Sequence, residues 1–433
     1  MRLRWLIWLS LAVLGAAGCR AAVPPLPECD PENGGLTLAE GFCAAVFADG
    51  IGVARHLVVA ENGDVWVNLE DAGRTSAGTT KVSGEAGRGG LVVLRDTSGD
   101  GRADRSVRIA TAGGTGIALR GPWVYYSTMT TVERRRIADG GLGLTGAADT
   151  VVFGMPVEGH ISRSLAFGDG DTLFVNVGSD SNSCRRNAVD KVGADPCPEL
   201  GIRAGIWQYR ADGVPQRHEP EARYATGIRN AVALAWLPGR GLYAVSHGRD
   251  GLHALWPAIY SSRASAEKPS EEFMRVAAGD DFGWPHCFHD LELDRKVMAP
   301  EYGGDGRTIG RCAGAKASLL GFPAHWAPDG LVFYRATRFP ARYREGAFVA
   351  FHGSWNRGPE PEDGYRVVFV PLADGQPSGG WEDFADGFAG RRKSPEGARY
   401  RPVGVAVAPD GALFVSDDQR GRIWRIVPSA ASQ

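Results

Sequence analysis

The sequence predicts an all-β protein, a six-bladed β-propeller of four-stranded antiparallel blades. Two observations support this fold. Glycine is abundant, at 60 of 433 residues, which suits many tight turns. A unit of two alternating apolar strands joined by a Gly, Asp or Asn turn recurs along the chain. Because one hairpin cannot bury its own face, such repeats indicate sheets packed around an axis; a pair of β-sandwiches is the alternative.

The N-terminal segment resembles a targeting signal. Two arginines precede an apolar run that ends at Leu14, and small residues lead to Cys19, as in a signal peptide of lipoprotein type. Ala16 stands where the lipoprotein pattern prefers Leu, so ordinary cleavage nearby is the alternative. We expect a periplasmic protein anchored to the membrane by lipid on Cys19. The expected parts are a signal peptide (1–18), a proline-rich tether (19–35) and the propeller (36–430).

The seven cysteines fit an oxidising compartment. If Cys19 carries lipid, six remain as three pairs that are close in sequence. The expected bridges are Cys29–Cys43, Cys184–Cys197 and Cys287–Cys312, each closing a short loop worth about 2–4 kcal/mol. Free buried thiols are the alternative.

Six hairpin copies can be placed in order along the chain. They cover 56–67, 116–126, 165–177, 231–245, 330–351 and 403–415. Segments 89–94, 205–209, 365–370 and 422–426 are candidates for outer strands. Helix is expected only near 270–274, just after Pro269. The net charge of −2 gives no basic field for nucleic acid.

His160 precedes the third hairpin, at the rim of a predicted sheet. Loops at such rims present functional groups on a rigid scaffold. An imidazole whose pKa is near neutrality suits proton transfer. The alternative is a structural histidine bonded to a backbone carbonyl.

An acidic loop is a candidate calcium site. Its oxygen-bearing residues are Asp96, Ser98, Asp100 and Asp104. They resemble the start of an EF-hand loop, but Val107 stands where that loop needs glutamate. A structural calcium turn and a plain acidic turn both remain open. Asp250, within His-Gly-Arg-Asp-Gly, is a further calcium candidate.

Five segments carry a family resemblance. They are Gly159–Phe167, Thr226–Asn230, Asp281–Pro285, Phe351–Arg357 and Arg401–Gly411. Together they resemble the soluble aldose and sorbosone dehydrogenases that use pyrroloquinoline quinone (PQQ), and most of all the sorbosone branch. The resemblance implies a six-bladed propeller that binds PQQ, with calcium held against it by cofactor oxygens and backbone carbonyls.

The resemblance also implies roles for particular residues. His160 is the expected general base, although some relatives have an acidic residue where this chain has Gly159. Residues expected to bind the cofactor are Arg229, Asn230, Arg399, Arg401, Trp355 and Arg357. His352 or Arg357 would replace a lysine that relatives carry in the fifth blade.

The expected activity is oxidation of an aldose or a sugar aldehyde such as sorbosone at C1. Hydride would pass to PQQ, and electrons would leave to a separate acceptor, a quinone or a cytochrome. Two alternatives are a calcium-dependent sugar lactonase and a propeller that binds sugar or PQQ without catalysis.

Overall fold

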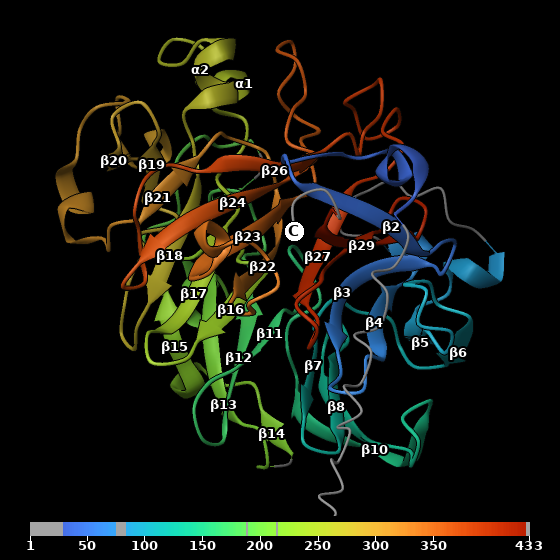
Figure 1. Cartoon of the computed structure of the whole chain (residues 1–433). Coiled ribbons are helices and arrows are strands. Elements are labelled where there is room, and N and C mark those ends of the chain that lie inside the picture. The colour runs from blue at the N-terminus through green and yellow to red at the C-terminus, as the bar shows by residue number, and fades with distance from the viewer. Residues whose placement is uncertain (1–28, 75–83, 188, 214, 430–433) are drawn as a thin grey trace, which may run out of the picture.

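The computed structural model describes residues 29–74, 84–187, 189–213 and 215–429. Over these residues the chain forms six antiparallel blades around an axis, which confirms the predicted propeller (Figure 1). The innermost strands of all six blades line one axial cavity. They are β3 (Val53–Val59), β7 (Ile117–Arg120), β11 (Leu165–Phe167), β16 (Ala233–Leu237), β22 (Pro328–Tyr334) and β27 (Pro402–Val407).

Blades 1 to 3 follow one another directly along the chain. Blade 1 continues with β4 (Val65–Glu70), β5 (Gly90–Arg95) and β6 (Arg105–Ile109). Blade 2 continues with β8 (Trp123–Ser127), β9 (Val132–Ile137) and β10 (Leu144–Phe153), and β14 (Gln216–Arg217) pairs with its edge in parallel. Blade 3 continues with β12 (Thr172–Val177), β13 (Gly205–Arg210) and β15 (Arg223–Thr226).

Blades 4 and 5 carry longer insertions. Blade 4 continues with β17 (Gly241–Ser246), β18 (Glu271–Val276) and β21 (Leu320–Phe322). Its insertions hold α1 (Leu252–Leu255), α2 (Ser262–Glu267), β19 (Cys287–Asp290) and β20 (Arg295–Met298). Blade 5 continues with β23 (Gly346–Phe351), β24 (Arg366–Ala373) and β26 (Glu382–Asp386), and adds β25 (Gln376–Pro377) and β1 (Thr37–Leu38).

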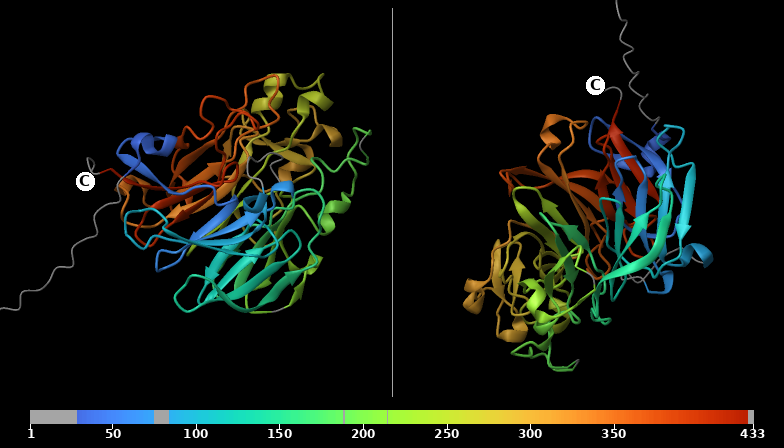
Figure 2. Two further views of the ribbon diagram at one scale, coloured as in Figure 1. Left: turned by 90° about the vertical axis from the view of Figure 1, so that its right-hand side faces the viewer. Right: turned by 90° about the horizontal axis from the view of Figure 1, so that it is seen from below.

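Blade 6 closes the ring with a strand from the other end of the chain. It continues with β28 (Leu413–Asp417) and β29 (Ile423–Pro428), and its outermost strand is β2 (Phe42–Ala48). Figures 1 and 2 show this strand, in blue, beside the red C-terminal strands. The propeller is therefore closed by backbone hydrogen bonds between its two ends.

Six apolar clusters fill the six interfaces between neighbouring blades. Strand β12 shows how the sequence produces them. Leu173 and Val175 face blade 2, whereas Phe174 between them faces blade 4. Because successive side chains of a strand point to opposite faces, a strand buried on both faces is apolar throughout.

The six predicted hairpins and the three predicted disulfides are confirmed. The segments predicted as outer strands are the third strands β5, β13, β24 and β29.

The helix expected near 270–274 is wrong. These residues form β18, which pairs with β17 on one side and β21 on the other. Phe273 is buried between Val245 and Leu320, so pairing within the blade decides the conformation. The α-helices of the described chain lie earlier, at α1 and α2.

The expected tether ends sooner than residue 35. Asp30 accepts a hydrogen bond from the backbone of Val46 and pairs with Arg102, and Asn33 accepts one from Ala44. Residues 29–35 are therefore fastened to blade 6, and the rest of the tether and the signal peptide lie outside the described residues. Within the part of the chain that the structure describes, no helix has the length and apolar character needed to cross a bilayer.

Phe42 tests the closure of the ring. Its ring lies 4.6 Å from that of Phe339 and 4.9 Å from that of Phe384, both in blade 5. Phe42→Ala should cost about 3–5 kcal/mol, because it leaves a cavity between the last two blades. The measurement is the thermal unfolding midpoint at one scan rate. The half-exposed Phe153→Ala is the control, and equal midpoints for the two variants would contradict the prediction.

Candidate active site

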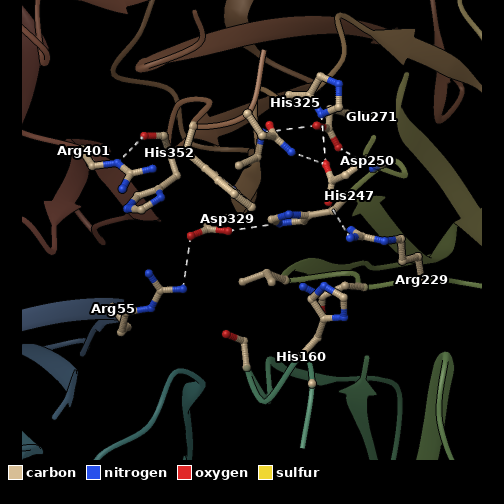
Figure 3. Close-up of a pocket in the computed structure, with 18 residues that line it drawn as sticks. Arg55, His160, Arg229, His247, Asp250, Glu271, His325, Asp329, His352 and Arg401 are labelled. Atoms are coloured by element: carbon tan, nitrogen blue, oxygen red, sulfur yellow. Dashed lines mark hydrogen bonds and ion pairs between the residues drawn. The ribbon is translucent and has the colours of Figure 1, made fainter. Parts of the chain in front are cut away.

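A polar cavity of about 160 Å³ opens on the axis where the loops that lead into the innermost strands meet the loops that follow the second strands (Figure 3). Blades 1, 3, 4, 5 and 6 contribute side chains to it. The charged and imidazole side chains of its wall are Arg55, His160, Arg229, His247, Asp250, Glu271, His325, Asp329, His352 and Arg401. Trp355 and Asn356 also line it.

His160 is held in one tautomer by the backbone. Its Nδ1 lies 2.7 Å from the carbonyl oxygen of Ser179, and its own backbone N–H donates to the same oxygen at 2.9 Å. A carbonyl can only accept, so Nδ1 carries the hydrogen and Nε2 keeps its lone pair. Burial, and then the charge of Arg229, lowers the pKa of His160 to about 3. The imidazole is therefore neutral, with one nitrogen free to accept a proton.

Gly159 explains the departure from the family pattern. Its φ is +68°, and a β-carbon there would lie 2.3 Å from the Cα of Asp180. No acidic side chain fits this position, so the Ser179 carbonyl orients the imidazole instead. The same segment is joined to blade 4, because the backbone N–H of Ser179 donates to the carbonyl of Arg229 at 2.7 Å.

Arg163 stabilises the loop that carries His160. This fully buried guanidinium donates to the carbonyls of Met129, Pro156 and His160, and has no carboxylate partner among the described residues. Burial, with the nearby charge of Arg203, lowers the pKa of Arg163 to about 9. A buried charge that binds three carbonyls fixes the backbone from which His160 extends.

Asp250 joins three residues on the other side of the cavity. Its carboxylate accepts from Arg229 at 2.8 Å, from His325 Nδ1 at 3.0 Å and from Asn356 at 2.5 Å. Burial raises its pKa, but Arg229 and His325 together hold the pKa well below the usual range. Nε2 of His325 lies 2.8 Å from the carbonyl of Ser265, so both ring nitrogens meet acceptors and His325 is an imidazolium.

Arg55 anchors the third side of the cavity. Its guanidinium lies 3.1 Å from Asp329 and 2.7 Å from Asp418. Asp329 in turn contacts His247 at 3.2 Å, and Asp418 contacts His352 at 2.8 Å. Two histidines from different blades are thus oriented by acids that share one arginine.

The structure brings most of the predicted site residues together. His160, Arg229, Asn230, Asp250, Trp355 and Arg401 all line the cavity, as does His352. Asn230 faces β12, where its side-chain oxygen accepts from Asn176 at 3.0 Å. Arg401 is fully buried and donates to the carbonyl of Gly353 at 2.9 Å. Trp355 stands at the rim with 63% of its surface exposed.

Two of the predicted cofactor ligands do not line the cavity. Arg357 donates to the carbonyl of Ala266 at 2.6 Å and pairs with Glu267, so it fastens α2 to blade 5. Arg399 is exposed, and its guanidinium lies 5.1 Å from the ring centre of Tyr400. Arg399 and Arg401 are two positions apart in one loop, but their side chains point to different sides. The motif that contains them did not indicate which of the two faces the cavity.

The acidic loop between β5 and β6 is bonded internally. Asp96 accepts from the backbone N–H groups of Gly99 and Gly101, both at 2.7 Å, and Asp104 accepts from the Thr97 hydroxyl at 2.6 Å. These hydrogen bonds suit an acidic turn with or without a bound ion, and Asp96, Ser98, Asp100 and Asp104 do not line the cavity. Over the described chain, one close group of three metal-ligating side chains occurs, Cys184, Cys197 and Glu199, and its cysteines form a disulfide.

Sequence reasoning missed much of the cavity wall, namely Arg55, His247, Glu271, His325, Asp329 and Asn356. A signal was present in two of these positions. Arg55 lies within β3 and Asp329 is the second residue of β22, both among mainly apolar neighbours, and both side chains are buried. A buried charge in an innermost strand implies a partner across the axis.

Comparison with known proteins supports the fold and gives a family. A family model described as TrAA12-like matches residues 36–429. A PQQ-dependent pyranose dehydrogenase of Coprinopsis cinerea is 25% identical over 434 aligned residues, 90% of this chain and 54% of that protein. An uncharacterized protein of Borreliella burgdorferi is 29% identical over 206 residues, 47% of this chain and 48% of that protein. The chain thus spans about half the length of these curated relatives.

Solved structures share the architecture. The holo form of the PQQ domain of the C. cinerea pyranose dehydrogenase has a TM-score of 0.70 at 21% identity, over 93% of this chain and 98% of that one. The calcium structure of a Trichoderma reesei protein of carbohydrate-active enzyme family AA12 has a TM-score of 0.72 at 18% identity, over 91% and 97%. At these identities the likeness concerns the fold.

Gly159→Ala tests the close contact behind His160. Gly170 is the matched control, since its φ is +62° but a β-carbon there would meet nothing within 4 Å. Gly170→Ala should lose about 1–2 kcal/mol for the left-handed backbone. Gly159→Ala should lose more, because the contact with Asp180 displaces the loop. The measurement is the free energy of unfolding in urea, and equal losses would contradict the prediction.

Proposed function

Because this chain belongs to the TrAA12-like family, we propose that it oxidises a sugar, with PQQ as the bound oxidant. The observation that carries the proposal is the pairing of two groups in one cavity. His160 offers a free imidazole nitrogen, and Arg229 offers a guanidinium whose buried Nε has no hydrogen-bond partner within the described chain. A base and an unsatisfied cationic donor suit a substrate hydroxyl beside an anionic cofactor.

The cavity residues fit PQQ, a planar molecule with three carboxylates and an ortho-quinone. Guanidinium groups match carboxylates in geometry and charge, and Arg55, Arg229 and Arg401 all line the cavity. Arg229 would hold a carboxylate of the cofactor through its guanidinium, and Trp355 offers a flat apolar face at the rim. When bound, PQQ supplies a quinone that accepts hydride from carbon.

His160 removes the hydroxyl proton of the sugar in this proposal. Its Nδ1–H stays on the Ser179 carbonyl, so Nε2 is the accepting atom throughout. The charge of Arg229 is one cause of the low pKa of His160. An anionic ligand beside Arg229 would offset that charge and raise the pKa of His160 toward the range of an effective base.

Calcium belongs to the proposed assembly on the family resemblance. The carboxylates of the cavity form no calcium cage, because Asp250 and Asp329 are already bound by arginine and histidine. An ion would depend on cofactor oxygens and backbone carbonyls, and no proton step proposed here involves it.

The substrate and the electron acceptor are proposed only by chemical class. The name of the C. cinerea relative supports a pyranose, with an aldose or a sugar aldehyde such as sorbosone oxidised at C1. Electrons would leave to a separate quinone or cytochrome.

Reconstitution tests the proposed oxidation. Purified protein with added PQQ and Ca²⁺ should reduce a dye in the presence of an aldose panel or sorbosone. His160→Asn should lower kcat by about 10²–10⁴-fold, the usual contribution of a general base, while PQQ binding measured by fluorescence quenching is retained. His253→Asn, in α1 and outside the cavity, is the control.

Two outcomes would contradict the proposal. One is the absence of dye reduction with every sugar, together with an unchanged absorption spectrum of PQQ. The other is hydrolysis of a sugar lactone without PQQ, which would favour the lactonase alternative.

We also propose that the mature protein is periplasmic and anchored through Cys19. The three disulfides support an oxidising compartment. The full chain should fractionate with membranes, and Cys19→Ser should release it into the soluble fraction. Wild-type protein found in the soluble fraction would refute the anchor.

A further inference from the structure

Three histidines of the cavity use only one ring nitrogen for hydrogen bonds within the described chain. His160 is bound through Nδ1, whereas His247 and His352 are bound through Nε2. The second nitrogen of each ring has no protein partner in the described chain, yet it is not fully buried. These nitrogens are therefore accessible from the cavity that the rings line.

The partners of His160 and His247 are of opposite kinds. The Nδ1 of His160 meets a neutral carbonyl. The Nε2 of His247 meets the carboxylate of Asp329 at 3.2 Å and the carbonyl of Pro328 at 3.1 Å, so it is a donor. A carboxylate partner stabilises an imidazolium, and a carbonyl partner beside an arginine does not.

The acidic groups around His247 also favour its protonated form. Burial alone would lower its pKa, but Asp329 and Glu271 raise the pKa above that of free histidine. Arg229 opposes them from the loop before β16, and Arg55 lies behind Asp329. Asp250 and the His325 imidazolium, which also line the cavity, form an ion pair with each other.

His352 differs from His247 despite its similar acid. Asp418 accepts from its Nε2 at 2.8 Å, yet burial and the neighbouring charge of Arg401 lower the pKa of His352. The imidazoles at 160 and 352 thus have lowered pKa values, whereas those at 247 and 325 have raised ones.

We propose that His247 is the proton donor of this site, with Nδ1 as the donating atom and His160 as its counterpart. The inference rests on the proposed function. Oxidation of a sugar H–C–OH to C=O releases a hydride to the quinone and a proton to Nε2 of His160. The transferred hydride carries a negative charge with it, and Nδ1 of His247 would donate the one proton that balances this charge. The two histidines return to their starting states by exchanging one proton each with water.

This division of labour follows from the environments of the two rings. Two titratable groups whose surroundings push their pKa values apart can serve as base and acid at one pH. Figure 3 shows His247 between Asp329 and the side of the cavity where Arg229 and His160 lie. The charge of His247 also contributes to the low pKa of His160, so the two rings influence each other across the cavity.

Histidine NMR on the protein without cofactor tests the charge state directly. His247→Gln assigns the signal, because the glutamine amide can keep the hydrogen bond to Asp329 but places no nitrogen at the Nδ1 position. We expect the His247 ring to be doubly protonated at pH 7 while the His160 ring is neutral. Asp329→Asn should move the His247 titration to lower pH. A His247 ring that is neutral at pH 7 would overturn the proposal.

Steady-state kinetics of the reconstituted enzyme test the use of that proton. An acid must be protonated to act, so kcat should fall as pH rises through the pKa of His247. Asp329→Asn should shift this alkaline fall to lower pH. His247→Gln should abolish the fall and lower kcat about 10²–10⁴-fold with little change in KM. His253→Gln is the control, since its ring is bonded outside the cavity, to the carbonyl of Tyr260.

The results separate the two proposals. Wild-type protein that oxidises no sugar would refute the proposed function. An active enzyme whose His247→Gln variant keeps the wild-type kcat and pH profile would refute the role of His247 alone.

Discussion

One buried positive charge holds three blades together. The Arg55 side chain is 1% exposed, and its guanidinium lies within 4 Å of Glu70, Asp329 and Asp418, which belong to blades 1, 5 and 6. Burial opposes this charge, but the three carboxylates raise the pKa of Arg55 above its ordinary value. Removing Arg55 would leave three buried carboxylates without their shared cation, which costs several kcal/mol. The packing of these three blades and the polar end of the axis therefore depend on the same buried cluster.

The same cluster determines the character of the cavity. Asp329 and Asp418 are shared between Arg55 and a histidine, so the arginine fixes where both imidazoles lie. At the other end of the axis the innermost strands present mainly apolar side chains such as Val58, Leu119 and Val332. One propeller thus has a polar end suited to chemistry and an apolar end suited to packing.

Much of this arrangement was predictable from local patterns. Alternating strands and their turns identified all six hairpins, and short motifs identified His160, Arg229 and Arg401. The helix expected at 270–274 was wrong because its conformation depends on two partner strands. Arg55 and Asp329 were missed for a similar reason, since each owes its role to the other across 274 positions of sequence. Arg357 and Arg399 show that a motif identifies residues close in sequence to a site. The direction in which each side chain points depends on the backbone conformation.

The pairing of β2 with β29 sets the order in which the molecule can assemble. Phe42 lies opposite Pro428, so β2 must wait for its partner until residue 428 has been synthesised. Until then its edge offers unpaired amide and carbonyl groups to any other extended strand. Closing so long a loop is slow, because entropy is lost before the contacts form. The edge of residues 42–48 therefore stays open to intermolecular pairing until β29 has emerged and docked against it.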